Sequence, residues 1–356
     1  AAGFLILSFY TVVAGWTMSY VFRTGSGTFE GATADGVASV FAAFLADPER
    51  LLAWHTIFMV MTTVVVSRGV RGGLEKAVKL LMPALFVLLI AMVGYGMTNG
   101  DFAAAVDYLF TPDFSALSRA GVLEAMGQAF FSLSLGMGAI MIYGSYLPSD
   151  ASIPRTVGVI AIMDTLVAVL AGLAIFPIVF AYGLEPAAGA GLIFNTLPIA
   201  FGQMPGGQAV GALFFLLLLF AAWTSAISLL EPIVAWMVEN RGMDRVKSAV
   251  VAGVTGWLLG VVSLLSLNVW AGYTVFGMGF FDLMDYLTAN IMLPVGGMLI
   301  AVFAGWRLSR SASALELQLG DGIVYRIWRF LTRYITPIAV LLVLLNVTGI
   351  LAILTP

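Results

Sequence analysis

The stretch that decides the fold is Phe130-Phe131-Ser132-Leu133-Ser134-Leu135-Gly136-Met137-Gly138-Ala139, in the middle of an apolar segment. From 132 to 138, Ser or Gly recurs at every second position, which is not a helical spacing. Gly136 and Gly138 each weaken a helix by about 1 kcal/mol relative to Ala. In hydrocarbon, unwound backbone is tolerated only where it lines a cavity enclosed by protein. We therefore expect either a helix interrupted at a ligand site or close helix packing on small residues, with neither favoured by this stretch alone.

A broken helix would place two kinds of free backbone group at mid-membrane. The half-helix after the break begins with free amides and a positive dipole end, and the half-helix before it ends in free carbonyls. Amides suit a carboxylate and carbonyls suit a small cation, so a break of this kind is typical of a transport site.

The composition of the whole chain sets the class of protein. Of its 356 residues, 61% are hydrophobic and 10% are charged, and the mean hydropathy is +1.03. A soluble domain is about half apolar and a quarter charged, so the sequence indicates a polytopic membrane protein. The absence of Cys and the single His, His55, exclude disulfides, thiolate sites and His-based zinc sites within the chain. We expect His55 to be a packing residue.

Apolar segments long enough to cross a bilayer as helices follow one another along the chain. We predict nine spans, at residues 3–22, 51–67, 74–98, 122–146, 154–182, 208–238, 246–267, 279–306 and 328–354. The connecting segments are polar, and the one at 183–207 is rich in Gly and Pro with a helical stretch inside it. The predicted fold class is an all-α integral membrane protein with a single transmembrane domain over residues 1–356.

The distribution of Lys and Arg predicts an orientation. If the first span runs outward, only Arg23, Arg50 and Arg119 of the sixteen Lys and Arg residues fall in outer loops. Basic residues accumulate on the cytoplasmic side of membrane proteins. We therefore expect a multi-pass protein whose first span starts in the cytoplasm and whose C-terminus lies outside.

Asp164 is a carboxylate near the centre of the fifth predicted span. It lies nine residues beyond Arg155 at the inner boundary, which is about 14 Å of helix rise. A carboxylate at that depth is costly without a partner, which favours a role in ion or proton coupling. The structural alternative is a hydrogen bond between helices that uses a protonated Asp.

One face of the sixth predicted span is small and hydroxylated. Ala221, Thr224, Ser225 and Ser228 are spaced i, i+3, i+4 and i+7, which places them on one side of a helix. Hydroxyl and carbonyl oxygens are the hard donors that bind alkali cations without adding charge. The common alternative use of such residues is hydrogen bonding between helices.

Four acidic and proline positions carry weaker signals. Glu231, followed by Pro232, is best explained by a helix kink and a hydrogen bond near the inner side. Asp282 and Asp285 open the eighth span, where acids are either dipole partners or half of an outer gate.

Three aromatic residues stand out in the first span. Trp16 and Tyr20 are consistent with an interfacial belt, but Tyr10 lies too deep for the belt and needs an internal partner.

Nothing in the sequence indicates an enzyme. It has no Walker motif and no Gly-rich nucleotide loop. No nucleophile–base pair or metal-ligand cluster accompanies Asp164. Transport by this chain would therefore draw on an ion gradient.

Several motifs in order resemble those of the neurotransmitter:sodium symporter family, and of its bacterial amino-acid transporters in particular. The motifs are Phe9-Tyr10 with Trp16-Thr17, 127–138 with 143–146, 173–177, 221–232 and 333–337. The match covers essentially the whole chain, and FFSLSLGMG at 130–138 is its most specific part.

The resemblance implies a five-plus-five inverted-repeat transporter fold, in which the nine spans correspond to the family's third to eleventh helices. The first two helices, about 80–90 residues, would then be missing. They would carry ligands for both sodium ions and part of the substrate grip. We therefore expect an N-terminally truncated transporter domain.

The resemblance also implies roles for individual residues. The substrate-binding residues would be Ile6, Tyr10, Phe131, Ser132, Ser134, Met137, Ser225 and Leu229. The first sodium site would use Ser132 and Asp164, and the second would use Ala221, Thr224 and Ser225. The outer gate would use Gln128, Phe131 and Asp285, with Phe131 as the lid.

The function so implied is a sodium-coupled symporter that imports an amino acid by alternating access. Asp164 stands where many members have Asn, and Ala168 stands where chloride-dependent members have Ser. A fixed carboxylate beside sodium replaces the charge that chloride would bring, so we predict chloride-independent uptake. Met137 stands where several relatives have Phe, and its flexible side chain favours a hydrophobic or aromatic substrate.

The expected partners are the amino-acid substrate, Na+ as a co-transported ion rather than a prosthetic group, and the lipid bilayer of a bacterial inner (plasma) membrane. No nucleic acid is expected, and a homodimer is left open. Two alternatives remain: a sodium- or proton-coupled carrier of the same fold for another small solute, and a non-transporting truncated remnant.

Overall fold

The computed structural model describes residues 1–115, 117–148, 150–186 and 189–350. Within these residues the protein is helical and contains one isolated β-bridge, so the all-α prediction is confirmed. The α-helices are α1 (Ala2–Gly25), α2 (Ala34–Leu45), α3 (Pro48–Ser67), α4 (Glu75–Asn99), α5 (Phe102–Phe110), α6 (Arg119–Ser132), α7 (Ala139–Ser145), α8 (Ile153–Ala181), α9 (Gly189–Gly191), α10 (Leu197–Gln203), α11 (Gly207–Arg241), α12 (Arg245–Leu265), α13 (Phe280–Tyr286), α14 (Leu293–Val302), α15 (Arg310–Glu316), α16 (Ile323–Phe330) and α17 (Thr336–Val347). The π-helical segments are η1 (Val70–Leu74), η2 (Leu192–Thr196), η3 (Leu287–Met292), η4 (Phe303–Arg307) and η5 (Leu331–Ile335).

Eight helical segments in the described part of the chain are long and apolar enough to cross a membrane. They are Ala2–Gly25, Pro48–Ser67, Gly72–Asn99, Ile153–Ala181, Gly207–Arg241, Arg245–Leu265, Phe280–Arg307 and Ile323–Val347. Each overlaps one of the nine predicted spans. The remaining predicted span, 122–146, is broken into α6 and α7, which explains why it is not among the eight. The last predicted span reaches 354, and its final residues lie outside the described residues.

Two predicted connections contain helices. The polar segments 23–50 and 99–121 hold α2 and α5. Both helices begin at a side-chain cap, because Thr33 Oγ1 accepts from Gly36 N at 3.2 Å and Asp101 Oδ1 accepts from Ala104 N at 3.0 Å. The helical stretch expected inside 183–207 is present as α9, η2 and α10.

The chain divides into two compact units. The first unit contains Ala1–Ile6, Asp113–Thr165 and the chain from Asp282 onward. The second unit contains Leu7–Pro112 and Leu166–Phe281.

An aromatic core holds the second unit together. Tyr20 is fully buried, and its ring centroid lies 5.0 Å from that of Phe194 and 5.1 Å from that of Phe215. Trp16 is 4% exposed and packs edge-on against Phe194 at 5.7 Å. The prediction of an interfacial belt for Trp16 and Tyr20 is therefore wrong: burying large aromatic area in this core replaces contact with the headgroups.

Helices α3 and α12 of the second unit lie side by side because α12 presents small residues to α3. A Cβ added at Gly260 would collide with the His55 ring. His55 is fully buried and its Nε2 lies 3.2 Å from the carbonyl oxygen of Trp257. The prediction that His55 is a packing residue is confirmed.

A buried ion pair joins α11 to α12 in the second unit. Glu231 is fully buried and accepts from Arg245 Nη2 at 2.5 Å. Arg245 Nε also donates to the carbonyl oxygen of Val66 at 3.0 Å. The predicted hydrogen bond of Glu231 is thus present, and α11 continues through Pro232.

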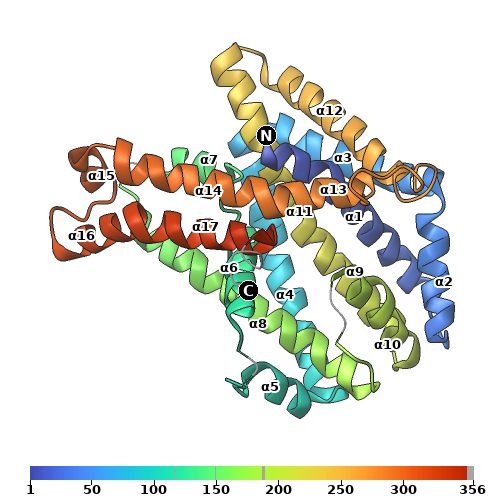
Figure 1. The fold of residues 1–356 in the computed structure, drawn as a ribbon. Helices are drawn as coiled ribbons and strands as arrows, with labels where there is room; N and C mark the ends of the chain where they lie inside the picture. The colour runs from blue at the N-terminus through green and yellow to red at the C-terminus, as the bar shows by residue number, and fades with distance from the viewer. Residues whose placement is uncertain (116, 149, 187–188, 351–356) are drawn as a thin grey trace. The chain divides into compact units, whose positions relative to one another are not determined.

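In the first unit, α14 lies beside both α17 and α6, and Figure 1 shows α14 and α17 running alongside each other. The segments η4 and η5 continue this contact, since Trp306 Nε1 donates to the carbonyl oxygen of Arg333 at 3.0 Å.

Candidate functional site

The predicted break in the fourth span is present in the first unit. Helix α6 ends at Ser132 and α7 begins at Ala139. Between them, Ser134, Gly136 and Gly138 have φ angles of 55°, 80° and 91°. A left-handed conformation costs a non-Gly residue such as Ser134 about 1–2 kcal/mol. Such outliers gather at functional sites, where the surrounding structure holds them in place.

The two sides of the break differ in how their backbone groups are satisfied. The last turn of α6 closes through Ser134 N to Phe131 O at 3.0 Å and Leu135 N to Phe130 O at 2.9 Å. The first amides of a helix have no intrahelical acceptor. Helix α7 begins after Gly138 without a side-chain cap, so no capping side chain accepts from these amides. The start of α7 therefore offers uncapped amides inside an otherwise apolar span.

Close backbone contact holds the break against α14. A Cβ at Gly136 would lie 2.9 Å from Gly297 N and closer still to Leu293 O. A Cβ at Gly296 would lie 2.5 Å from Gly136 O. Only glycine permits backbones to approach this closely, so the structure contains both of the features that the sequence left open, an interruption and a small-residue contact.

A hydroxyl at the break contacts the carboxylate of Asp164. Ser132 Oγ donates to Asp164 Oδ2 at 3.1 Å. Asp164 lies on α8 and is half-buried. The two residues assigned to the first sodium site on resemblance are thus direct neighbours within the first unit.

The other predicted site residues of the first unit differ in burial. Ile6 is buried, while Met137 is half-buried and Phe131 is 37% exposed. Gln128 and Asp285 are both exposed, and among the described residues no hydrogen bond joins their side chains. The structure does not assemble the two into a closed gate.

The second unit holds the remaining predicted residues on α1 and α11. The Tyr10 hydroxyl hydrogen-bonds the Ser225 side chain, which confirms the prediction of an internal partner for Tyr10. Thr224 Oγ1 donates to the carbonyl oxygen of Ala221 at 2.9 Å, so the oxygens of these two residues are adjacent. Leu229 is buried one turn further along.

Reasoning from sequence missed the ion pair between Glu231 and Arg245. From the sequence, Arg245 was used only as one of the basic residues that predict the orientation in the membrane. A carboxylate inside an apolar helix followed by a short basic connection was the available signal, because a buried acid requires a partner.

The sequence of this chain is similar to those of known membrane transporters. The model of the sodium:neurotransmitter symporter family matches residues 47–353. The chain belongs to this family.

Individual relatives are similar to this chain over nearly its whole length. It is 38% identical to the sodium-dependent transporter YhdH of Bacillus subtilis over 355 residues, covering 99% of this chain and 79% of that protein. It is 32% identical to a sodium-dependent transporter of Haemophilus influenzae over 348 residues, covering 96% and 76%. The crystal structure of MhsT in complex with L-phenylalanine matches with a TM-score of 0.88 and 44% identity, covering 98% of this chain and 79% of MhsT.

Family membership fixes the general activity. The chain is a sodium-dependent membrane transporter rather than an enzyme, and it has the inverted-repeat fold of its family. Its ligands are a small-molecule substrate and sodium, and sodium is cargo rather than a resident cofactor.

Proposed function

We propose that this family member imports a hydrophobic or aromatic amino acid together with sodium, by alternating access and without chloride. The observation that carries the proposal is the contact between Ser132 and Asp164 at the break. The Ser132 hydroxyl and the Asp164 carboxylate supply hard oxygen donors of the kind that a small cation binds. The complex of MhsT with L-phenylalanine supports the class of substrate.

We assign Ser132 and Asp164 to one sodium site and Ala221, Thr224 and Ser225 to another. The adjacent oxygens of Ala221 and Thr224 support the second assignment, because they form a paired donor set without charge.

We also assign residues of both units to substrate binding and to the outer gate. Tyr10, held by Ser225, would bind the substrate carboxylate. In the first unit, the residues that would contact the substrate are Ile6, Phe131, Ser132, Ser134 and Met137. In the second unit, they are Ser225 and Leu229. Phe131 would act as a lid, with Gln128 and Asp285 in the outer gate.

We also propose that residues 1–356 form one transmembrane transporter domain in a bacterial inner membrane. The bias of Lys and Arg supports a first span that starts in the cytoplasm and a last span that ends outside.

Uptake of labelled L-phenylalanine into proteoliposomes that contain the full-length protein tests the proposal. An inward sodium gradient should drive uptake, choline in place of sodium should abolish it, and gluconate in place of chloride should leave it unchanged. Leucine, tryptophan and tyrosine should compete more strongly than glycine or aspartate. Uptake that is independent of sodium, or a preference for glycine, would refute the proposal.

The substitution Asp164→Asn tests the sodium assignment. Asn keeps an acceptor for Ser132 but removes a charge that is worth about 4 kcal/mol to a cation at about 4 Å in a partly polar site. Even after screening, the sodium concentration for half-maximal uptake should rise about tenfold or more, and chloride should now stimulate uptake. Asp35→Asn, at an exposed position in the first turn of α2, is the matched control and should change neither. Equal behaviour of the two variants would count against the assignment.

A further inference from the structure

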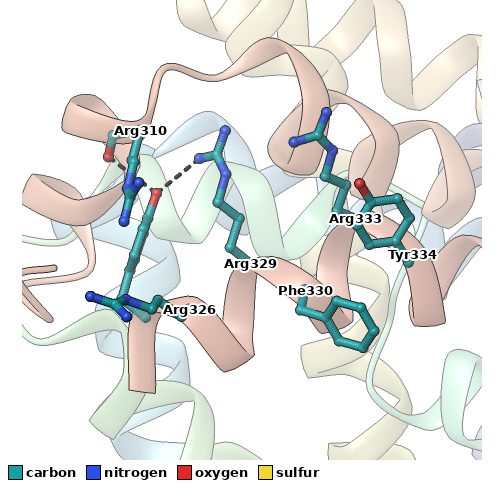
Figure 2. A pocket seen from close by; sticks show the side chains of 7 residues that line it. Arg310, Arg326, Arg329, Phe330, Arg333 and Tyr334 are labelled. Atoms are coloured by element: carbon teal, nitrogen blue, oxygen red, sulfur yellow. Dashed lines mark hydrogen bonds between the residues drawn. The ribbon is translucent and has the colours of Figure 1, made fainter. Parts of the chain in front are cut away.

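A pocket of about 500 Å³ lies among α15, α16 and η5 of the first unit, and none of its residues belongs to the proposed transport site. We refer to it as the arginine pocket because four of its lining residues are Arg310, Arg326, Arg329 and Arg333. Figure 2 shows the guanidinium groups of Arg329 and Arg333 extending to the same side of the chain. Cavities of this volume suit a small organic ligand rather than a single ion.

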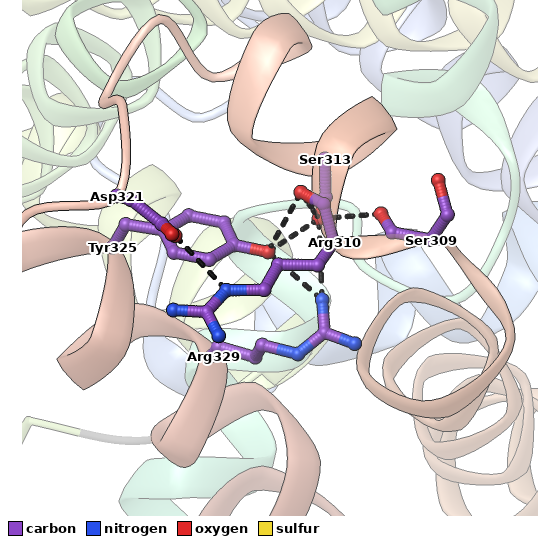
Figure 3. A network of polar contacts seen from close by, with 6 residues as sticks. All are labelled: Ser309, Arg310, Ser313, Asp321, Tyr325 and Arg329. Carbon is purple, nitrogen blue, oxygen red and sulfur yellow. Dashed lines mark hydrogen bonds and ion pairs between the residues drawn. The ribbon is translucent and has the colours of Figure 1, made fainter.

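Arg329 is held in place by neutral groups. Its Nη1 donates to the Tyr325 hydroxyl at 2.8 Å and to Ser313 Oγ at 3.3 Å. Tyr325 is fully buried, and its hydroxyl lies 2.7 Å from Ser313 Oγ and donates to the carbonyl oxygen of Arg310 at 3.1 Å (Figure 3). This network positions the guanidinium without neutralising it.

Carboxylates offset little of the charge in the pocket. Arg310 pairs with Asp321 at 2.9 Å. In the part of the chain that the structure describes, no carboxylate oxygen lies within ion-pair distance of Arg326, Arg329 or Arg333. Over residues 303–335 the sequence has five arginines and two acids. The pocket therefore carries a net positive charge that an anionic ligand would balance.

Arg333 is also oriented by neutral contacts. Its guanidinium lies 4.0 Å from the centre of the Trp306 ring, and its backbone oxygen accepts from Trp306 Nε1. Among the described residues its buried Nε has no hydrogen-bond partner. An arginine stacked in this way keeps its forked donors available, and the fork matches the oxygens of a phosphate group.

Apolar side chains adjoin the pocket on the helix that continues into the membrane. The apolar span Ile323–Val347 includes the lining residues of α16 and η5. Phe330 is 55% exposed, Ile327 is 52% exposed and Tyr334 is 42% exposed. A phosphate ligand with hydrocarbon chains would match both surfaces, and basic pockets beside membrane spans recognise lipid headgroups in this way.

We propose that the arginine pocket binds a phosphate group, and that its occupant is the headgroup of an anionic phospholipid whose acyl chains lie along the exposed apolar side chains of α16. The proposal is independent of the amino acid transported, because lipid retention is measured without uptake.

Native mass spectrometry of the purified protein in detergent tests the proposal, with phosphatidylglycerol and phosphatidylcholine added separately. Phosphatidylglycerol should be retained more strongly than phosphatidylcholine. Arg329→Gln and Arg326→Gln should each weaken phosphatidylglycerol binding about tenfold, because each removes a charged donor. Arg241→Gln is the matched control: this arginine lies over the Trp236 ring in the last turn of α11, outside the pocket, and its loss should leave binding unchanged.

Two further variants separate charge from position. Arg329→Lys keeps the charge but loses the fork, and should bind between the wild type and Arg329→Gln. Tyr325→Phe keeps the buried ring but removes the hydroxyl that holds Arg329, and should weaken binding without changing the elution profile of the protein. A melting temperature measured for every variant shows whether the fold is intact.

Three outcomes would overturn the proposal. They are equal retention of phosphatidylcholine, equal binding by Arg329→Gln and Arg241→Gln when both are folded, and saturable binding of inorganic phosphate by the protein without retention of phosphatidylglycerol. The last outcome would identify a free phosphate site instead of a lipid site.

Discussion

Alanine at Gly136, compared with alanine at Gly138, tests whether backbone contact with α14 supports the break. Both residues have left-handed φ angles, 80° and 91°, so Ala costs about 1–2 kcal/mol at either position. Only at Gly136 would the added Cβ collide with backbone, whereas at Gly138 nothing lies within 4 Å of it. Overpacking adds about 1–3 kcal/mol. We therefore expect a loss of about 2–5 kcal/mol for Gly136→Ala and of about 1–2 kcal/mol for Gly138→Ala.

The assay is the melting temperature of detergent-solubilised protein, read from the monodisperse peak in size-exclusion chromatography after heating. Gly136→Ala should lower it about twice as far as Gly138→Ala. Gly296→Ala probes the contact from α14: its Cβ would lie 2.5 Å from Gly136 O, so it should add the overpacking loss of about 1–3 kcal/mol without the backbone strain. Equal losses at Gly136 and Gly138 would refute the reasoning, because backbone strain alone would then explain both.

Three further predictions address the second unit and the membrane orientation. Arg245→Ala should destabilise the protein by about 3–5 kcal/mol in the same heating assay, because it leaves the fully buried Glu231 carboxylate without its partner. Glu231→Ala should cost less, because the Arg245 side chain is 24% exposed to solvent. The reverse order would contradict this reasoning. Tyr10→Phe should raise the KM for uptake about tenfold with little change in melting temperature, since one hydrogen bond to a charged group is lost; an unchanged KM would remove Tyr10 from the substrate site. Residues 1–356 contain no Cys, so the single substitutions Ser26→Cys and Asn240→Cys can each be labelled in intact cells with a membrane-impermeant maleimide. We expect labelling of the Ser26→Cys variant alone. Labelling of the Asn240→Cys variant alone would invert the proposed topology.

The break and the spans could be predicted because each depends on local chemistry. The alternation of Ser and Gly at 132–138 opposes a helical period wherever it occurs, and the structure breaks the helix there. Long apolar runs likewise specify spans by their length. Helices α2 and α5 were missed because their polar caps and short length made them look like loops.

Contacts between distant segments could not be predicted from the sequence. Nothing near Trp16 or Tyr20 indicates that Phe194, on a later connection, completes an aromatic core around them. Arg245 follows Glu231 by fourteen residues, and only the reversal between α11 and α12 brings them together. The contact of Ser132 with Asp164 required knowledge of how α6 and α8 approach each other, which the family resemblance implied and periodicity did not.

The single histidine of this chain gives the transporter a spectroscopic handle of its own. A carbonyl oxygen can only accept, so the contact with Trp257 requires a proton on Nε2 of His55. Within residues 1–356, isotope labelling of histidine would therefore yield one imidazole signal, located where α3 meets α12. Its nitrogen frequencies would reveal whether that helix pair stays closed while the protein cycles through transport.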